Sequence, residues 1–187
     1  MLDFHEIFDT HFFSNHHIQA KKLEATFEQR FDGLECVSFS SYEGLLITLC
    51  DEVCDARTGI FSYPQGDDNE SKTQSLQAWL AHTHRPAIEQ LTPEQARVIS
   101  SKKPAHLQPQ AVVLREAQLV AYVLDGARWH EMLAGAGILL SADAQVAEKV
   151  RWARSSYGRN GKAQISIASN GRFSEFQAML IEQALGV

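Results

Sequence analysis

The chain has 187 residues, of which 44% are hydrophobic and 21% charged, with a formal net charge of −6. This length and composition are typical of one globular domain with a sizeable core. The acidic balance excludes a general nucleic-acid binder, because phosphate binding needs a basic surface. No apolar run approaches the roughly 18 residues of a membrane span. Residues 1–6 (MLDFHE) lack the basic and apolar regions of a signal peptide, so we expect a cytoplasmic protein.

The cysteines and histidines do not predict a metal site. Three cysteines, Cys36, Cys50 and Cys54, are an odd number, which indicates reduced thiols. Cys50 and Cys54 are four residues apart and would share one helix face, which is typical of packing. The histidine pairs at 16–17 and 82–84 do not converge on one helix face.

The sequence pattern of the first half of the chain predicts two strands and the helices that flank them. The aromatic-rich residues 1–13 are expected to dock on a core or on a partner subunit. A helix is predicted from Ser14 or Asn15 to about Phe31, ended by Asp32-Gly33. Then follow, in order, a strand at 35–40, a turn at 41–44, a helix over 45–53, a strand at 59–63 and a helix at 72–82. A strand followed by a turn and a helix start binds anions in many α/β proteins, although most such units bind nothing.

The second half adds further strands. Thr92-Pro93 is an N-cap with proline at the first helical position, and it leads into a predicted strand at 96–100. The proline-containing segment near 101–110 is the best candidate for an internal break. Predicted next are strands at 111–114, 118–124 and 136–143 and a helix that begins at Asp143 and ends near Tyr157-Gly158. Strands that alternate with helices favour a three-layer α/β domain.

The C-terminal stretch combines a turn with a capped helix. Asn170-Gly171 is a strong turn signal, and Ser174 or Asn170 can cap the following helix. Its apolar positions, at 176, 179, 180 and 185, recur at roughly helical spacing. Arg172 and Glu175 flank the helix start, where backbone N–H groups form a ready anion site.

Three segments resemble one enzyme family. Residues 170–180 (NGRFSEFQAML) resemble the N-x-R-M-S-E-F-Q-A-A segment of the DegT/StrS-type nucleotide-sugar aminotransferases, which are pyridoxal-phosphate (PLP) enzymes of fold type I. Residues 135–150 resemble the family's G-E-G-G-A-[IV]-V-T-x-D segment and the helix after it. Residues 40–46 (SSYEGLL) resemble its S-S/N-G-T-x-A-L turn. The resemblance implies a three-layer α/β/α sandwich, a shortened PLP-transferase-like large domain over residues 1–187.

The resemblance also implies candidate site residues. Ser40 and Ser41 match the turn whose backbone amides hold the PLP phosphate, and Asn170 and Arg172 match the cofactor-binding end of the C-terminal segment. In the family this asparagine often reaches the phosphate from the neighbouring subunit of a dimer. The chain departs from the family at the turn, where Tyr42-Glu43 replaces Gly-Thr and brings a carboxylate to the phosphate position.

The catalytic residues of the family do not carry over. Counting back from Gly137 to the Schiff-base lysine leads to Trp129, and no lysine occurs between Lys103 and Lys149. The aspartate that faces the pyridine nitrogen has no counterpart either, because no aspartate occurs between Asp68 and Asp125. A PLP aminotransferase needs both groups.

We therefore favour a non-catalytic homologue, a pseudoenzyme, over an active enzyme. It would bind a sugar-nucleotide or phosphorylated ligand, or a partner in a homodimer or with a family paralogue. One alternative is a sugar dehydrase or aminotransferase-like enzyme that binds PLP or PMP noncovalently and uses His130 as its base. The other is an unrelated small α/β binding protein. No metal, nucleic acid or membrane is expected as a partner.

Overall fold

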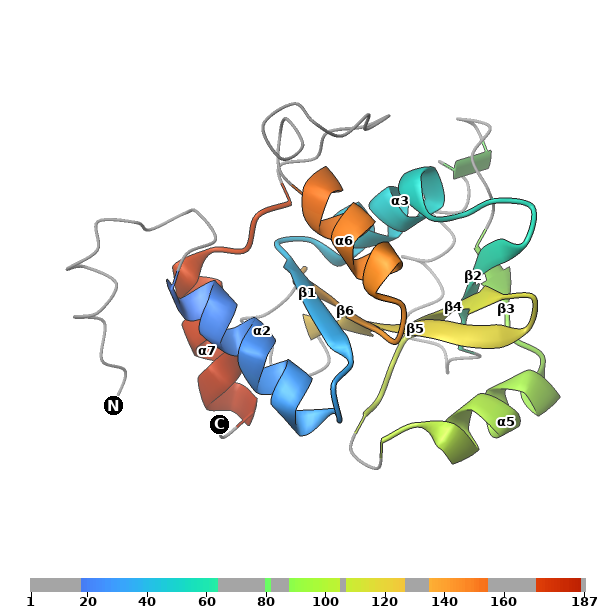
Figure 1. The fold of residues 1–187 in the computed structure, drawn as a ribbon, viewed down its shortest axis with the longest axis horizontal. Coiled ribbons are helices and arrows are strands. Elements are labelled where there is room, and N and C mark those ends of the chain that lie inside the picture. The colour runs from blue at the N-terminus through green and yellow to red at the C-terminus, as the bar shows by residue number, and fades with distance from the viewer. Residues whose placement is uncertain are drawn as a thin grey trace.

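The computed structural model describes residues 18–63, 80–81, 88–104, 107–126, 135–154 and 171–185. A six-stranded sheet, with strand order β1-β6-β5-β4-β2-β3, lies between two layers of helices (Figure 1). Neighbouring strands are antiparallel except β2 and β3, which are parallel. The described strands are β1 (Glu35–Phe39), β2 (Thr58–Ser62), β3 (Glu89–Gln90), β4 (Ala111–Arg115), β5 (Gln118–Asp125) and β6 (Gly137–Ser141). The main helices are α2 (Ile18–Arg30), α3 (Tyr42–Glu52), α5 (Pro93–Lys102), α6 (Ala144–Ala153) and α7 (Glu175–Leu185).

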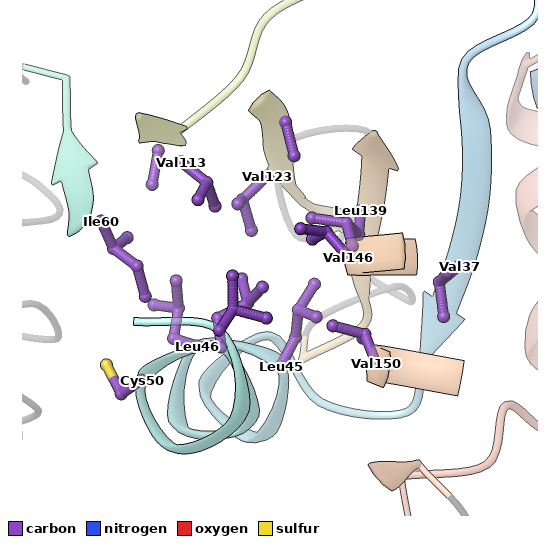
Figure 2. Close-up of a cluster of buried hydrophobic side chains, with 14 of the residues drawn as sticks. Val37, Leu45, Leu46, Cys50, Ile60, Val113, Val123, Leu139, Val146 and Val150 are labelled. Atoms are coloured by element: carbon purple, nitrogen blue, oxygen red, sulfur yellow. The ribbon is translucent and has the colours of Figure 1, made fainter. Parts of the chain in front are cut away.

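Each face of the sheet has its own hydrophobic core. Helices α3 and α6 cover one face, and Figure 2 shows the side chains of this first core, including Val37, Leu45 and Val150. Helices α2, α5 and α7 cover the other face, where Phe27 and Phe173 are among the largest buried side chains. Alternate residues of β1, β4 and β6 serve the two cores, as the pleat requires. The three-layer α/β arrangement predicted from the sequence is therefore confirmed.

Local signals placed most of the described elements correctly. Helix α2 ends at a left-handed pair, with φ of 50° at Asp32 and 79° at Gly33. Ser174 is the residue that caps α7, because its Oγ accepts a hydrogen bond from the Gln177 backbone N–H at 3.0 Å. Helix α3 begins at Tyr42, so the predicted turn at 41–44 is the helix N-terminus itself.

The strand predicted at 96–100 is wrong, because these residues belong to α5. Thr92 and Gln95 form a reciprocal capping box, and Pro93 occupies the first helical turn. Val98 and Ile99 favour strands locally, but in the helix Ile99 and Ala96 pack on the core and Val98 does not. Ile99 is buried, whereas Val98 is 47% exposed. The cap therefore outweighs the β-branched pair.

Other predictions were partly right or lie outside the described residues. Helix α6 ends at Ala153, earlier than predicted. The candidate break near 101–110 contains Leu107, which is 2% exposed and packs in the core shared with α2. Residues 1–17 and most of the helix predicted at 72–82 are outside the described part of the chain. Within that part, no helix is both long and apolar enough to cross a membrane.

The outer edge of β1 is closed by side chains instead of another strand. Glu24 Oε1 accepts hydrogen bonds from the backbone N–H and the hydroxyl of Ser38, both at 2.7 Å. The Arg154 guanidinium donates to the Ser38 carbonyl at 2.9 Å and lies 2.6 Å from the same carboxylate oxygen. The Glu24 and Arg154 side chains are only 11% and 9% exposed, so this pair is buried.

The same arrangement repeats two residues earlier on β1. Glu28 accepts from the Cys36 N–H at 3.0 Å, and Arg151 donates to the Cys36 carbonyl at 3.0 Å. Arg151 also pairs with Glu28 at 3.2 Å and with Glu35 at 2.6 Å. Two carboxylates from α2 and two guanidiniums from α6 thus replace a neighbouring strand along the edge. We call this set, Glu24, Glu28, Arg151 and Arg154, the edge ladder.

We expect Arg154→Ala to lower the free energy of unfolding by about 3–5 kcal/mol, because it leaves the buried Glu24 carboxylate without its cation. Urea-induced unfolding followed by circular dichroism measures the change. Arg57→Ala is the control, since the Arg57–Glu116 pair is 69% and 65% exposed and should contribute no more than about 1 kcal/mol. Equal losses in the two variants would contradict the structural role of the ladder.

Candidate functional site

Three of the predicted site residues, Ser40, Ser41 and Arg172, lie near the place where β1 and β5 end and β6 begins. Gly137, the first residue of β6, pairs with Phe39 of β1 on one side and with Asp125 of β5 on the other. Because β6 runs antiparallel to both neighbours, the carboxyl ends of β1 and β5 meet at one edge of the sheet. We call this region the carboxyl edge; it comprises residues 40–44, 125–126, 135–137 and 171–172.

The C-terminal segment joins the carboxyl edge through its backbone. The Ser40 N–H donates to the Gly171 carbonyl at 3.1 Å, and the Gly171 N–H donates to the Arg154 carbonyl at 3.1 Å. Gly171 thus continues the edge ladder by one further step along β1. The structure thereby brings Ser40, Ser41 and Arg172 into one region, although they are far apart in the sequence. Arg172 is partly buried there.

Position 171 requires glycine because the Phe39 side chain lies directly against it. A Cβ built on Gly171 would lie 2.3 Å from Cε1 and 2.5 Å from Cδ1 of the Phe39 ring. Two residues later, Phe173 enters the core on the opposite face of the sheet. The segment therefore crosses from one layer to the other against the end of β1.

The start of α3 is held by the chain's own polar groups. Ser41 caps the helix, because its Oγ accepts from the Gly44 N–H at 3.0 Å. The Ser41 hydroxyl in turn donates to the Glu43 carboxylate at 3.2 Å. The Tyr42 N–H donates to the Gly135 carbonyl in the segment before β6. Two of the first three amides of α3 therefore already have acceptors within the chain.

The segment before β6 lies directly against this helix start. A Cβ on Gly137 would approach the Tyr42 Cα to 2.9 Å and the Ser41 carbonyl oxygen to 3.2 Å. Gly137 is needed for this approach, which leaves no room for an extra carbon atom between β6 and α3. The backbone of β6 therefore covers the first turn of the helix.

The residues present do not fit the phosphate that the family resemblance implies. Phosphate binding at a helix start depends on backbone N–H groups that are open to the ligand. Here the Tyr42 and Gly44 amides are occupied and the Glu43 carboxylate lies beside them. A carboxylate next to a phosphate is repulsive by roughly 4 kcal/mol at 4 Å and an effective dielectric constant near 20.

Two predicted residues lie outside the described part of the chain, and one feature was missed. Asn170 and His130 are both in segments that the structure does not describe, as are all eight histidines. Asp125 is 4% exposed at the carboxyl edge, and its backbone N–H donates to Gln110 Oε1. Asp125 was not among the predicted site residues, although an acidic residue at the end of an apolar strand was the available signal. Among the described residues, no group of three metal-ligating side chains comes together.

Comparison with solved structures places the described architecture in the PLP-dependent aminotransferase fold. The chain matches NtdA from Bacillus subtilis, determined with the cofactor PMP bound, with a TM-score of 0.59, 13% identity and coverage of 95% of this chain and 49% of NtdA. It matches Helicobacter pylori PseC, an aminotransferase involved in pseudoaminic acid biosynthesis, with a TM-score of 0.55, 12% identity and coverage of 93% and 59%.

A DegT/DnrJ/EryC1/StrS aminotransferase from Brucella abortus also matches, with a TM-score of 0.54, 9% identity and coverage of 92% of this chain and 59% of that one. The chain thus spans only about half to three fifths of the length of these proteins. No protein-family model and no curated protein sequence matches it. The structural resemblance predicted from residues 135–150 and 170–180 is therefore confirmed at the level of the fold.

We expect Gly171→Ala to lower the free energy of unfolding by about 1–3 kcal/mol, because the added methyl group overlaps the buried Phe39 ring. Thermal unfolding monitored by circular dichroism measures the loss. Gly44→Ala is the matched control, since its Cβ would meet only the Ser41 side chain at an ordinary 3.4 Å. Adding Phe39→Leu to Gly171→Ala should restore part of the loss. A Gly171→Ala variant as stable as the control would contradict the contact.

Proposed function

We propose that the protein is a non-catalytic homologue of the PLP-dependent sugar aminotransferases and acts by binding. The ancestry is supported by two independent observations, the sequence resemblance at 135–150 and 170–180 and the fold match over more than nine tenths of the chain. A shared fold alone does not imply a shared activity. The function therefore has to be argued from the carboxyl edge.

The closed start of α3 is the observation that carries the proposal. An aminotransferase of this class depends on a phosphate cradle to position its cofactor. In this chain Ser41, Glu43 and the Gly135 carbonyl occupy the groups that would form one. These internal contacts favour folding, since each backbone N–H at a helix start that has no partner within the helix needs another acceptor. It replaces a ligand site with an internal contact.

The sequence supports the same conclusion independently of the structure. No lysine occurs between Lys103 and Lys149, the interval in which the family carries its Schiff-base residue. Arginine cannot replace lysine there, because its guanidinium remains protonated and is not nucleophilic.

The binding partner we favour is a second copy of the chain or a full-length family paralogue. In the family, cofactor sites are assembled from two subunits, and the matching asparagine reaches across the dimer. In this chain the Gly171 carbonyl accepts a hydrogen bond from the Ser40 N–H, which holds the C-terminal segment at the carboxyl edge.

Purified protein mixed with PLP should show only the spectrum of free cofactor, because the Tyr42 and Gly44 amides already have acceptors and the Glu43 carboxylate repels the phosphate. Absorbance titration, followed by borohydride reduction and intact mass measurement, tests this. Pyridoxal without phosphate is run in parallel to measure random reaction with surface lysines. A stoichiometric adduct, or a visible band that inorganic phosphate competes away, would contradict the proposal.

A reversion variant sharpens the same measurement. Tyr42→Gly with Glu43→Thr restores the Gly-Thr pair of the family turn and removes the competing carboxylate. We expect it to bind PLP or inorganic phosphate roughly ten- to a hundredfold more tightly than the parent chain. Glu52→Thr, at the other end of α3, removes the same charge and serves as the control. Equal affinities in the two variants would mean that Glu43 does not block the cradle.

Sedimentation velocity over a wide concentration range should show a concentration-dependent dimer if the second copy is the partner. Asn170→Ala is expected to weaken that dimer, as the family role of this residue implies. The Asn170→Ala variant should unfold at the same temperature as the parent chain, which thermal unfolding checks. A strictly monomeric protein would leave the paralogue as the partner and would remove the cross-subunit role of Asn170.

A further inference from the structure

Two cysteines lie one helical turn apart at the carboxyl end of α3. The helix ends at Glu52, but the Val53 and Cys54 N–H groups both donate to the Leu49 carbonyl at 3.0 Å. The chain therefore keeps turning through Cys54. Cys54 consequently lies on the same face as Cys50, four residues earlier.

Both thiols face the same hydrophobic core. Cys50 is 2% exposed at the end of the first core, where Figure 2 shows its sulfur atom. Cys54 packs against that core and is only partly buried. A side-chain hydrogen bond joins the two thiols. Cys54 is therefore the more exposed of the two residues, and Cys50 lies deeper in the core.

The surroundings of the pair favour thiolate at the accessible position. The hydrogen bond from Cys50 is the main cause that lowers the pKa of Cys54, and the Ile60 backbone contributes in the same direction. Burial and the carboxylates of Asp55 and Asp51 oppose the shift without reversing it. The thiolate is the reactive form in disulfide exchange.

The third cysteine has the opposite character. Cys36 is buried on the other side of the sheet, in the core shared by α2 and α7. Burial raises the pKa of its thiol well above the ordinary value, and Glu24 and Glu28 add to the effect. Cys36 can therefore neither react readily nor reach the other two cysteines.

We propose that Cys50 and Cys54 form a reversible intramolecular disulfide by exchange with a low-molecular-weight disulfide. The Cys54 thiolate attacks one sulfur of the small disulfide, and the displaced thiolate takes up the Cys54 proton. Cys50 then attacks the Cys54 sulfur of the mixed disulfide and releases the second small thiol with its own proton. The two protein thiols are oxidised, and one small disulfide is reduced to two thiols. This pair is a modification site that acts independently of ligand binding at the carboxyl edge.

The geometry needs only a small adjustment at the helix end. Neighbouring Cβ atoms four residues apart on a helix are about 5–6 Å apart, whereas a disulfide needs about 3.5–4.5 Å. The shift falls on the last turn, where Cys54 already lies beyond the final residue of α3. After it, Asp55 starts the tight turn that leads to β2 at Thr58. The disulfide would therefore tie the last turn of α3 directly ahead of β2.

Exposure of the folded protein to glutathione disulfide tests the proposal. We expect the intact mass to fall by two hydrogen atoms with no glutathione retained. Asp51 and Glu52 lie between the two cysteines, so a protease that cuts after acidic residues separates Cys50 from Cys54 in the reduced protein. In the oxidised protein the two fragments should remain linked until a reductant is added. A chain that keeps all its thiols, or carries a stable glutathione adduct on Cys54, would overturn the proposal.

Three variants identify the role of each sulfur. Cys50→Ser should retain one glutathione, because Cys54 still attacks but no second thiol resolves the adduct. Cys54→Ser should remain unmodified. Cys36→Ala should behave as the parent chain. Circular dichroism checks that each variant is folded. If a variant does not fold, the fragment mapping of the parent chain still shows whether the Cys50–Cys54 disulfide forms. A disulfide that includes Cys36 in the folded protein would also overturn the assignment.

Discussion

The edge ladder is the constraint on which the rest of the structure depends. β1 lies at the edge of the sheet, where unpaired N–H and C=O groups would otherwise invite another chain. Glu24 and Glu28 are four residues apart on α2, and Arg151 and Arg154 are three apart on α6, so each pair matches the two-residue repeat of the strand. Helices from opposite faces of the sheet thus meet at one strand and fix each other's position.

The same edge also fixes the candidate site. The N–H groups of Cys36 and Ser38 point away from the sheet, and so does that of Ser40, two residues further along the chain. The Ser40 N–H donates to the Gly171 carbonyl. The C-terminal segment is thereby placed in line with the ladder, and Glu175 of α7 accepts hydrogen bonds from the Gln19 and Ala20 amides at the start of α2. The carboxylate flanking α7 therefore caps another helix in place of binding a ligand. Packing and site geometry depend on one continuous set of polar contacts.

The elements that the sequence predicted correctly are those with strong local signals. Asp32-Gly33 and Ser174 each fix a helix end through their own backbone and side-chain chemistry. The segment at 96–100 was mistaken for a strand because Val98 and Ile99 weighed more in the local pattern than the capping box before them. The edge ladder could not be predicted, because it joins charges from α2 and α6 that look like solvated helix faces in the sequence. Asp125 was missed because its position depends on strand pairing. Only the register of β5 and β6 shows that Asp125 lies beside Gly137.

The departure at Tyr42-Glu43 acquires its meaning only from the structure. The sequence alone shows that Glu43 stands at a position where the family binds phosphate. It does not show whether the carboxylate points into solvent or toward the helix start. In the structure the Glu43 carboxylate accepts a hydrogen bond from the hydroxyl of Ser41, the residue that also caps the helix. Glu43 therefore takes part in closing the helix start, together with the Gly135 carbonyl and the close approach of Gly137 to Tyr42. Two separate segments of the chain, residues 41–44 and 135–137, contribute to this closure, so one substitution would not reopen it fully. A helix start that is internally satisfied stabilises the fold, and the same contacts exclude the anion that related folds are built to hold.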